Sequence, residues 1–194
     1  MRQILRPALS LLIALSILTG LIYPLLLTAV AHTAFAGQAD GSFIEREGKP
    51  VGSRMIGQNF SDPKYFWGRL SATADANGKP LPYNAGASGA SNLGPTNSAL
   101  VDEVKGRIEA LAAADPDNKD LVPVDLVTSS ASGLDPDISP AAALYQVHRV
   151  AKARGWDEGK VRALVESHTQ GRTLGVLGEP RVNVVELNLA LDGS

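Results

Sequence analysis

The sequence predicts an α+β protein with one N-terminal transmembrane helix, followed by a single extracytoplasmic domain of short strands, ordered loops and about three helices. Three observations lead to this class. No formally charged residue occurs from Pro7 to Gln38. A stretch rich in Gly, Asn, Ser and Pro follows, over residues 37–97. Beyond it, apolar residues recur at helical spacing in three segments and at alternate positions in a last one.

The membrane segment covers residues 8–31. As a helix it spans roughly 36 Å, which exceeds the hydrocarbon core of about 30 Å. Helix is the expected state for a single span, because backbone groups in lipid must pair within their own segment. Pro24 removes one backbone donor and Gly20 lies one turn earlier. We therefore expect a kink there, covered by a neighbouring helix.

The charges that flank this segment predict its orientation. Arg2 and Arg6 precede it, and the first residues after it are neutral. The positive-inside rule then places residues 1–7 in the cytoplasm and residues 32–194 outside. A cleaved signal peptide is the alternative, since residues 34–36 (Ala-Phe-Ala) have the form of a cleavage site. The apolar run is much longer than the roughly 7–15 residues of a signal peptide. A mature chain that starts near Gly37 would establish the alternative.

Composition bounds the partners of the external part. Residues 37–194 carry 16 basic against 20 acidic residues, a net charge of −4, which argues against nucleic acid or an anionic lipid surface as partner. Their number suggests one domain. The absence of cysteine excludes disulfides, thiolate metal sites and cysteine nucleophiles.

Residues 37–97 predict short strands and ordered loops. Asn97 or Ser98 is expected to cap a helix that runs to about Ala114, with its buried face formed by Leu100, Val104, Ile108 and Leu111. A loop over residues 122–140 follows. Ser139-Pro140 is a strong helix start. That helix is expected to run to about Arg154, with Leu144, Val147 and Ala151 facing inward and Gly155 as its stop.

Asp157 is predicted to cap a third helix, which carries Val161, Leu164 and Val165 and ends at Gly171. The closing segment, residues 182–191, predicts a strand. Its apolar residues alternate with period two, at Val185, Leu187, Leu189 and Leu191. Val182 and Val184 are out of phase with that face, which suggests a bulge or a strand buried on both sides.

The search for chemistry predicts no catalytic and no metal-ligating residue. Three histidines lack any metal-ligand spacing, and neither a GxSxG elbow nor a phosphate loop occurs. The serine-rich run 128–133 lacks the context of a nucleophile. The Asp-Lys-Thr-Gly-Thr phosphorylation motif of P-type ATPases is also absent, so we expect this chain alone not to hydrolyse ATP.

Four polar, glycine-bearing loops remain, at residues 52–60, 65–73, 83–93 and 125–136. Side-chain bonds to the backbone make such loops rigid without regular structure. Rigid loops with aromatic residues and an arginine suit docking onto a partner, although they are equally compatible with being only the connections of the fold. The residues predicted to dock are Gln58, Arg69, Ser71, Thr73, Ser88, Gly89 and Asn92.

In order and spacing, these loops resemble the C subunit of the Kdp-type potassium-transporting ATPase. The resemblance covers essentially the whole chain and is carried by collinear segments at 5–8, 19–24, 56–58, 69–73, 88–93, 125–128, 139–140, 149–154, 182–184 and 189–192. The chain departs from the family pattern at Leu70, where Pro is usual, and at Ala90, where Gly is usual. It also departs at Asp137, where many members have His or Asn.

The resemblance implies a single-pass accessory subunit of a pump in the bacterial cytoplasmic (inner) membrane. Its partners would be a channel-like A subunit, an ATP-hydrolysing B subunit, a small F subunit and membrane lipid. No cofactor would be bound firmly, and the complex would handle ATP and potassium. The family is described as a catalytic chaperone that raises the apparent ATP affinity of the B subunit. This description involves Gln146 and Arg149 as nucleotide-related residues.

The predicted topology conflicts with direct nucleotide contact, because ATP is cytoplasmic and Gln146 lies outside. Gln146 and Arg149 are three residues apart on a helix, so we expect them to share an exposed face and to bond each other. The alternative function is a membrane-anchored extracytoplasmic binding module or hydrolase unrelated to transport. Only a pump subunit predicts that deletion abolishes growth at very low potassium.

The membrane helix is expected to be more than a tether. Its locally irregular face of close-packing residues is of the kind that associates with other helices, and consists of Thr19, Gly20, Tyr23 and Pro24. We predict that this face packs against helices of the A subunit.

Overall fold

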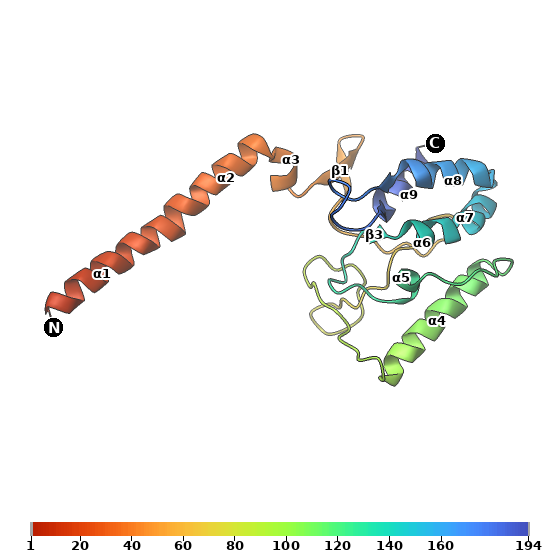
Figure 1. Ribbon diagram of the computed structural model, residues 1–194, viewed down its shortest axis with the longest axis horizontal. Helices are drawn as coiled ribbons and strands as arrows, with labels where there is room; N and C mark the ends of the chain where they lie inside the picture. The colour runs from red at the N-terminus through yellow and green to blue at the C-terminus, as the bar shows by residue number, and fades with distance from the viewer. Residues whose placement is uncertain (1, 194) are drawn as a thin grey trace. The chain divides into compact units, whose positions relative to one another are not determined.

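The computed structural model describes residues 2–193 and divides into two compact units between Phe43 and Ile44. The first unit is helical (Figure 1). It comprises α1 (Arg2–Ile17), the π-helix η1 (Leu18–Ile22), α2 (Tyr23–Ala34) and the short α3 (Ala36–Ala39).

Among the described residues, one helix is long and apolar enough to cross a membrane, judged by length and composition. It runs from Gln3 to Ala34, contains an 18-residue stretch with a mean hydropathy of 2.2, and extends beyond the predicted span of residues 8–31 at both ends. A π-helical turn lies where we predicted a kink. The Tyr23 N–H donates to the Leu18 carbonyl, five residues back. Pro24 follows with no N–H to donate, so the local register is irregular.

The second unit contains two small sheets. The strands β1 (Phe43–Arg46) and β2 (Lys49–Ser53) pair with each other. The other sheet is antiparallel with the order β3-β5-β4, formed by β3 (Asp137–Ile138), β5 (Arg181–Asn183) and β4 (Thr169–Gln170). Residues 54–97 form loops and turns joined by isolated bridges, as expected for this stretch.

The three predicted helices start where the sequence predicts them. Helix α4 (Ser98–Ala114) is capped by the side chain of Asn97, and α8 (Glu158–Ser167) by that of Asp157. Leu111 on α4 is buried, but Ile108 is exposed, which contradicts its predicted inward position. Helix α8 ends at Ser167, with His168 as its C-cap, and not at Gly171, because the chain turns directly into β4.

The predicted helix over residues 140–154 is divided in two. Ser139 caps α6 (Pro140–Tyr145), and α7 (Val147–Arg154) ends at Gly155 in a left-handed conformation. Gln146 stands between them with φ −91° and ψ −5°. Val147 and Ala151 are buried as predicted, whereas Leu144 is exposed, because the break rotates α6 relative to the face that continuous periodicity would give.

The predicted closing strand is wrong beyond Asn183. Strand β5 covers only Arg181–Asn183, and α9 (Val184–Asp192) follows. The Asn183 side chain accepts from the Glu186 N–H at 3.1 Å and thereby caps the helix. The buried residues of α9 follow helical spacing, at Val184, Val185, Leu187, Asn188 and Leu191. The phase change that suggested a bulge is the boundary between strand and helix.

The core joins the C-terminal helices to the loops. Helices α8 and α9 lie on one side of α6 and α7, and α4 lies on the other, with the short α5 (Val124–Val127) between (Figure 1). Phe66 and Trp67, from an otherwise irregular loop, are buried in the same cluster as residues of these helices. The loops are therefore held to the helices at Phe66 and Trp67, which positions the candidate site.

Candidate docking site and its internal support

Two buried amide side chains hold the backbone of Phe66 and Trp67. The Phe66 N–H donates to Asn188 Oδ1 at 2.8 Å, and Asn188 Nδ2 donates to the Phe66 carbonyl at 2.9 Å. In the same way, the Trp67 N–H donates to Gln146 Oε1 at 2.8 Å, and Gln146 Nε2 donates to the Trp67 carbonyl at 3.1 Å. Each amide thus satisfies both backbone groups of one residue, as a neighbouring strand would.

Arg149 supports the same segment from α7. Its Nη1 donates to the carbonyls of Pro63 at 2.6 Å and Tyr65 at 3.0 Å, and its Nη2 donates to Gln146 Oε1 at 2.6 Å. The guanidinium lies over the Trp67 ring, 4.3 Å from its centroid. Burial, reinforced by the Arg107 cation, lowers the pKa of Arg149 to about 10, so the group remains charged at neutral pH.

The predicted exposed face for Gln146 and Arg149 is wrong, because the two side chains are only 1% and 3% exposed. The predicted bond between them is confirmed. Gln146 uses both amide protons, one on Trp67 and one on the Ala142 carbonyl at 3.1 Å. In this arrangement the pair presents no free donor or acceptor of Gln146 to a nucleotide, and its contacts are those of a structural element.

Arg69 connects two of the predicted docking loops. Its Nη1 lies 3.3 Å from Asp135 Oδ2, and its Nη2 donates to the Ser129 carbonyl at 3.1 Å. Nη2 also reaches Thr128 Oγ1 at 3.4 Å. Leu70, the first departure from the family pattern, forms a bridge with Ser129. The 69–73 loop is therefore fixed against the 125–136 loop.

The loops 65–73, 83–93 and 125–136 are bonded to one another, and we call them the loop cluster. The hydroxyls of Ser71 and Thr73 lie at its centre. Ser71 Oγ donates to the Gly133 carbonyl at 2.6 Å and accepts from the Tyr83 N–H at 2.9 Å. Thr73 Oγ1 donates to the Leu81 carbonyl at 2.7 Å and accepts from the Asn84 N–H at 3.1 Å. The hydroxyl groups of both side chains therefore already have hydrogen-bond partners, and these bonds join three loops.

Ser88 and Gly89 attach the middle of the 83–93 loop to the 125–136 loop. Ser88 Oγ and the Gly89 N–H both donate to the Ser132 carbonyl, at 3.0 and 2.9 Å. Gly133 is next to this contact with φ +68°, and a Cβ built there would lie 2.5 Å from Thr73 Cγ2 and 2.8 Å from the Gly89 carbonyl oxygen. The close approach of the loops therefore requires glycine at position 133.

Tyr83 fills the space between the loops. Its hydroxyl donates to the Arg69 carbonyl at 2.7 Å, and its ring packs so close to Gly57 that a Cβ there would lie 2.4 Å from Tyr83 Cε1. Burial raises the pKa of Tyr83 to about 12. The phenol is therefore neutral at physiological pH and keeps its proton for this bond.

The structure brings most of the predicted docking residues together, but it assigns them different parts. Ser88 and Asn92 are exposed, whereas Thr73 is buried and supports the loops from inside. Gln58, Arg69 and Ser71 are half-buried and line one hollow of about 100 Å³. The half-buried Gly89 contributes backbone, and the described contact of the Asn92 side chain is local, to the Ala90 carbonyl.

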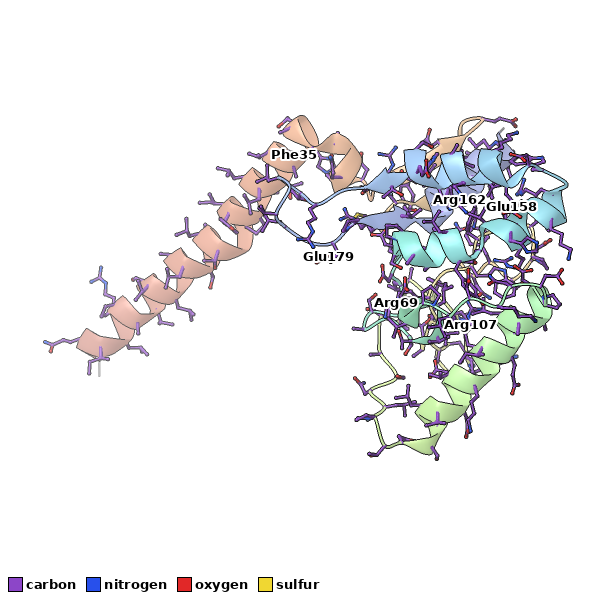
Figure 2. All side chains as sticks on the ribbon, turned by 45° about the vertical axis from the view of Figure 1, so that its right-hand side comes forward. Phe35, Arg69, Arg107, Glu158, Arg162 and Glu179 are labelled. Carbon is purple, nitrogen blue, oxygen red and sulfur yellow. The ribbon has the colours of Figure 1, made fainter. Side chains whose placement is uncertain are left out.

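Sequence reasoning missed Arg107, which lines the same hollow from α4 (Figure 2). Its Nε donates to the Leu126 carbonyl at 3.0 Å, and its Nη2 donates to the Gly68 carbonyl at 2.9 Å. A signal was present, because position 107 lies three residues after Val104 and four before Leu111, on the buried face of the helix. The residues to which Arg107 donates lie 19 and 39 positions away in the chain, so they could not be predicted from the local sequence.

The serine-rich run is structural in this arrangement. The Ser130 N–H donates to the Leu70 carbonyl at 3.1 Å, and Ser129 Oγ lies 3.3 Å from Ser91 Oγ. Asp137, another departure from the family pattern, pairs with Arg181 at 3.0 Å. Within residues 2–193, no group of three or more His, Asp or Glu side chains is arranged to hold a metal ion.

Comparison with known proteins gives a consistent result over the whole chain. The family model KdpC, described as "K+-transporting ATPase, c chain", matches residues 5–193. A potassium-transporting ATPase KdpC subunit from Variovorax paradoxus is 63% identical over 194 residues, covering 100% of this chain and 98% of the relative.

Two further relatives carry the same name. The Herpetosiphon aurantiacus protein is 62% identical over 192 residues, covering 99% of this chain and 97% of the relative. The Sorangium cellulosum protein is 60% identical over 190 residues, covering 98% of this chain and 97% of the relative. The chain therefore belongs to the KdpC family, the c chain of the K+-transporting ATPase.

Proposed function

We propose that this chain is a non-hydrolytic accessory subunit anchored in the bacterial inner membrane by the helix Gln3–Ala34. The N-terminal residues 1–7 lie in the cytoplasm and residues 32–194 outside. The supporting observations are the apolar length of the helix, the arginines at positions 2 and 6 and the lack of an ATP-hydrolysis motif. Its partners are the channel-like A subunit, the B subunit that hydrolyses ATP and the small F subunit.

The external domain sits near the potassium entrance of the A subunit and stabilises the assembled pump. The observation that carries this proposal is the cross-bonded loop cluster. Ser71 and Thr73 tie three loops into one body, and Ser88 stands exposed at its edge. A surface fixed before contact loses little conformational entropy on binding, which favours a lasting subunit interface.

Any effect on ATP affinity is indirect in this proposal. Gln146 and Arg149 are buried and occupied, and they lie in the domain that we place outside. A subunit that binds one state of a complex more tightly than another shifts the complex toward that state, and thereby changes ligand affinity at a distant site. The chaperone role then requires no nucleotide contact. The chain's membership of a potassium-transporting ATPase family favours this reading over a binding module or hydrolase unrelated to transport.

Crosslinking tests the docking surface. The chain contains no cysteine, so Ser88→Cys gives a single attachment point on the exposed edge of the loop cluster. We expect a short bifunctional reagent at this position to give adducts with the A subunit in the assembled pump. Glu166→Cys, on the exposed part of α8, is the matched control and should give few. Adducts of the Ser88→Cys chain only with cytoplasmic domains would overturn the proposed location.

A substitution in the membrane helix tests the second contact. A Cβ built at Gly20 meets no other heavy atom of the described chain within 4 Å, so Gly20→Leu fits the helix itself. The predicted close-packed face consists of Thr19, Gly20, Tyr23 and Pro24. If this face contacts a partner helix, the larger leucine side chain forces the two helices apart. We expect clearly less of this subunit to co-purify with the pump. Ala29→Leu serves as the control, and intact assembly of Gly20→Leu would show that this face is not the contact.

A further inference from the structure

A hairpin loop between β4 and β5 carries three exposed aliphatic side chains. Leu174, Val176 and Leu177 are 87%, 71% and 59% exposed. They belong to residues 173–178 (Thr-Leu-Gly-Val-Leu-Gly), which contain no charge and which we call the apolar tip. Exposed apolar residues gathered at one projecting turn are a mark of an interaction site.

The backbone of the apolar tip is fixed. Thr173 and Leu177 exchange N–H···O bonds of 2.9 and 3.0 Å, and the Val176 N–H donates to the Thr173 carbonyl at 3.3 Å. At the neck, Arg172 Nη2 bonds both carboxylate oxygens of Glu179 at 2.8 and 2.6 Å. The N–H groups of Thr173, Val176 and Leu177 are thus satisfied within the tip, which lowers the penalty for entering an apolar environment.

The choice of leucine at the turn is not explained by the turn itself. Leu174 and Gly175 both have positive φ, +55° and +76°, as in a type I′ turn. Such turns favour Asn-Gly or Asp-Gly, and a leucine in the left-handed region is strained. The side chain is also almost fully exposed, so packing within the domain does not favour leucine either. A contact with something outside the domain would account for an apolar residue here.

The position of the hairpin indicates what this outside contact is. Figure 1 shows the loop between β4 and β5 on the same side of the domain as β1, where the chain enters the domain, and Figure 2 shows Glu179 in this loop. Nine residues, 35–43, separate the apolar helix from Ile44. Even fully extended they reach only about 30 Å. In an anchored chain, the point where the chain enters the domain therefore stays within about 30 Å of the end of the membrane helix.

We propose that the apolar tip enters the interfacial region of the outer leaflet and forms a second contact of this chain with lipid. The proposal rests on the proposed anchoring by residues 3–34. The ligand chemistry is that of glycerol and the first acyl carbons, since the tip offers aliphatic side chains and no charge. The external part has a net charge of −4, so insertion depends on apolar contact and not on anionic headgroups.

A labelled full-length chain tests this directly. Val176→Cys, the only cysteine in the chain, is labelled with an environment-sensitive fluorophore and reconstituted in phosphatidylcholine vesicles. We expect a blue-shifted emission and several-fold stronger quenching by a shallow nitroxide lipid than at the control position. That control is Leu121→Cys, another aliphatic position of the domain, which is 94% exposed. Adding phosphatidylglycerol should leave the quenching at position 176 unchanged.

A second variant separates insertion from folding. Leu174→Asn places a favoured residue in the turn, so the hairpin should form at least as well as before. We expect lipid quenching of the label at position 176 to fall several-fold while the circular dichroism spectrum is retained. Unchanged quenching in Leu174→Asn would overturn the role of the tip.

Two other outcomes would also overturn the proposal. A label at position 176 that stays accessible to aqueous iodide shows a tip in water. A label that is shielded only after the other pump subunits are added, without nitroxide quenching, shows a protein pocket as the occupant. Failure of the anchor itself is seen separately, as release of the unlabelled chain by alkaline carbonate.

Discussion

Gln146→Leu lowers the free energy of unfolding of the domain by more than about 3 kcal/mol. The substitution removes the partner of both backbone groups of Trp67 and of one Ala142 carbonyl, all at a position 1% exposed. It also deprives the buried Arg149 cation of its 2.6 Å acceptor. Urea unfolding of the full-length chain in detergent, followed by the fluorescence of the buried Trp67, measures the change.

Gln170→Leu is the matched control, because Gln170 is exposed on β4. A surface substitution of this kind usually changes stability by less than about 0.5 kcal/mol. The comparison also decides how Gln146 acts in the pump. If Gln146→Leu unfolds like the unchanged chain and yet alters the apparent ATP affinity, Gln146 is a ligand-binding residue, and the structural role described above is wrong.

The amide side chains of Gln146 and Asn188 bond to the backbone of distant residues, which explains why the exposure of Gln146 was mispredicted from the sequence. Gln146 follows an apolar run on a predicted helix, and a glutamine three residues before an arginine normally marks a solvated face. Its partner is the backbone of Trp67, 79 residues earlier in the chain. The partner of Asn188 is the backbone of Phe66, 122 residues earlier. No local pattern specifies a bond at that separation, because it depends on the packing of α7 and α9 against the loop.

Elements defined by local chemistry were predictable. Asn97, Ser139 and Asp157 each cap a helix because the bond from the cap to the backbone lies within one turn. The predicted closing strand was wrong because its local pattern was ambiguous. Alternation over a few residues fits strand and helix alike, and the deciding feature was Asn183 followed three residues later by Glu186, a helix-start signature.

The candidate site was predictable as a set of loops but not as a surface. Glycine and short polar residues indicate rigid connections wherever they are placed, which is why residues 69–73 and 83–93 stood out. Which hydroxyls are consumed inside the cluster depends on the loops meeting one another. Thr73 and Ser88 read alike in sequence, yet only Ser88 is exposed.

Gly133→Ala destabilises the domain by about 2–4 kcal/mol and disrupts the loop cluster. Two effects add. At φ +68° any other residue is strained, and the new Cβ would lie 2.5 Å from Thr73 Cγ2 and 2.8 Å from the Gly89 carbonyl oxygen. Thr73 cannot move freely, because its hydroxyl is bonded to the Leu81 carbonyl at 2.7 Å. Thermal unfolding and hydrogen exchange at the Gly89 amide measure both consequences.

Gly155→Ala separates strain from crowding. Gly155 has nearly the same backbone conformation, φ +65°, but a Cβ built there meets no heavy atom of the described chain within 4 Å. It should therefore lose only about 1 kcal/mol. The difference between the two variants isolates the contact between loops, and only Gly133→Ala should weaken the Ser88→Cys crosslink to the A subunit. Equal stability losses, with the crosslink retained in both variants, would mean that the close approach of the loops at Gly133 contributes nothing to docking.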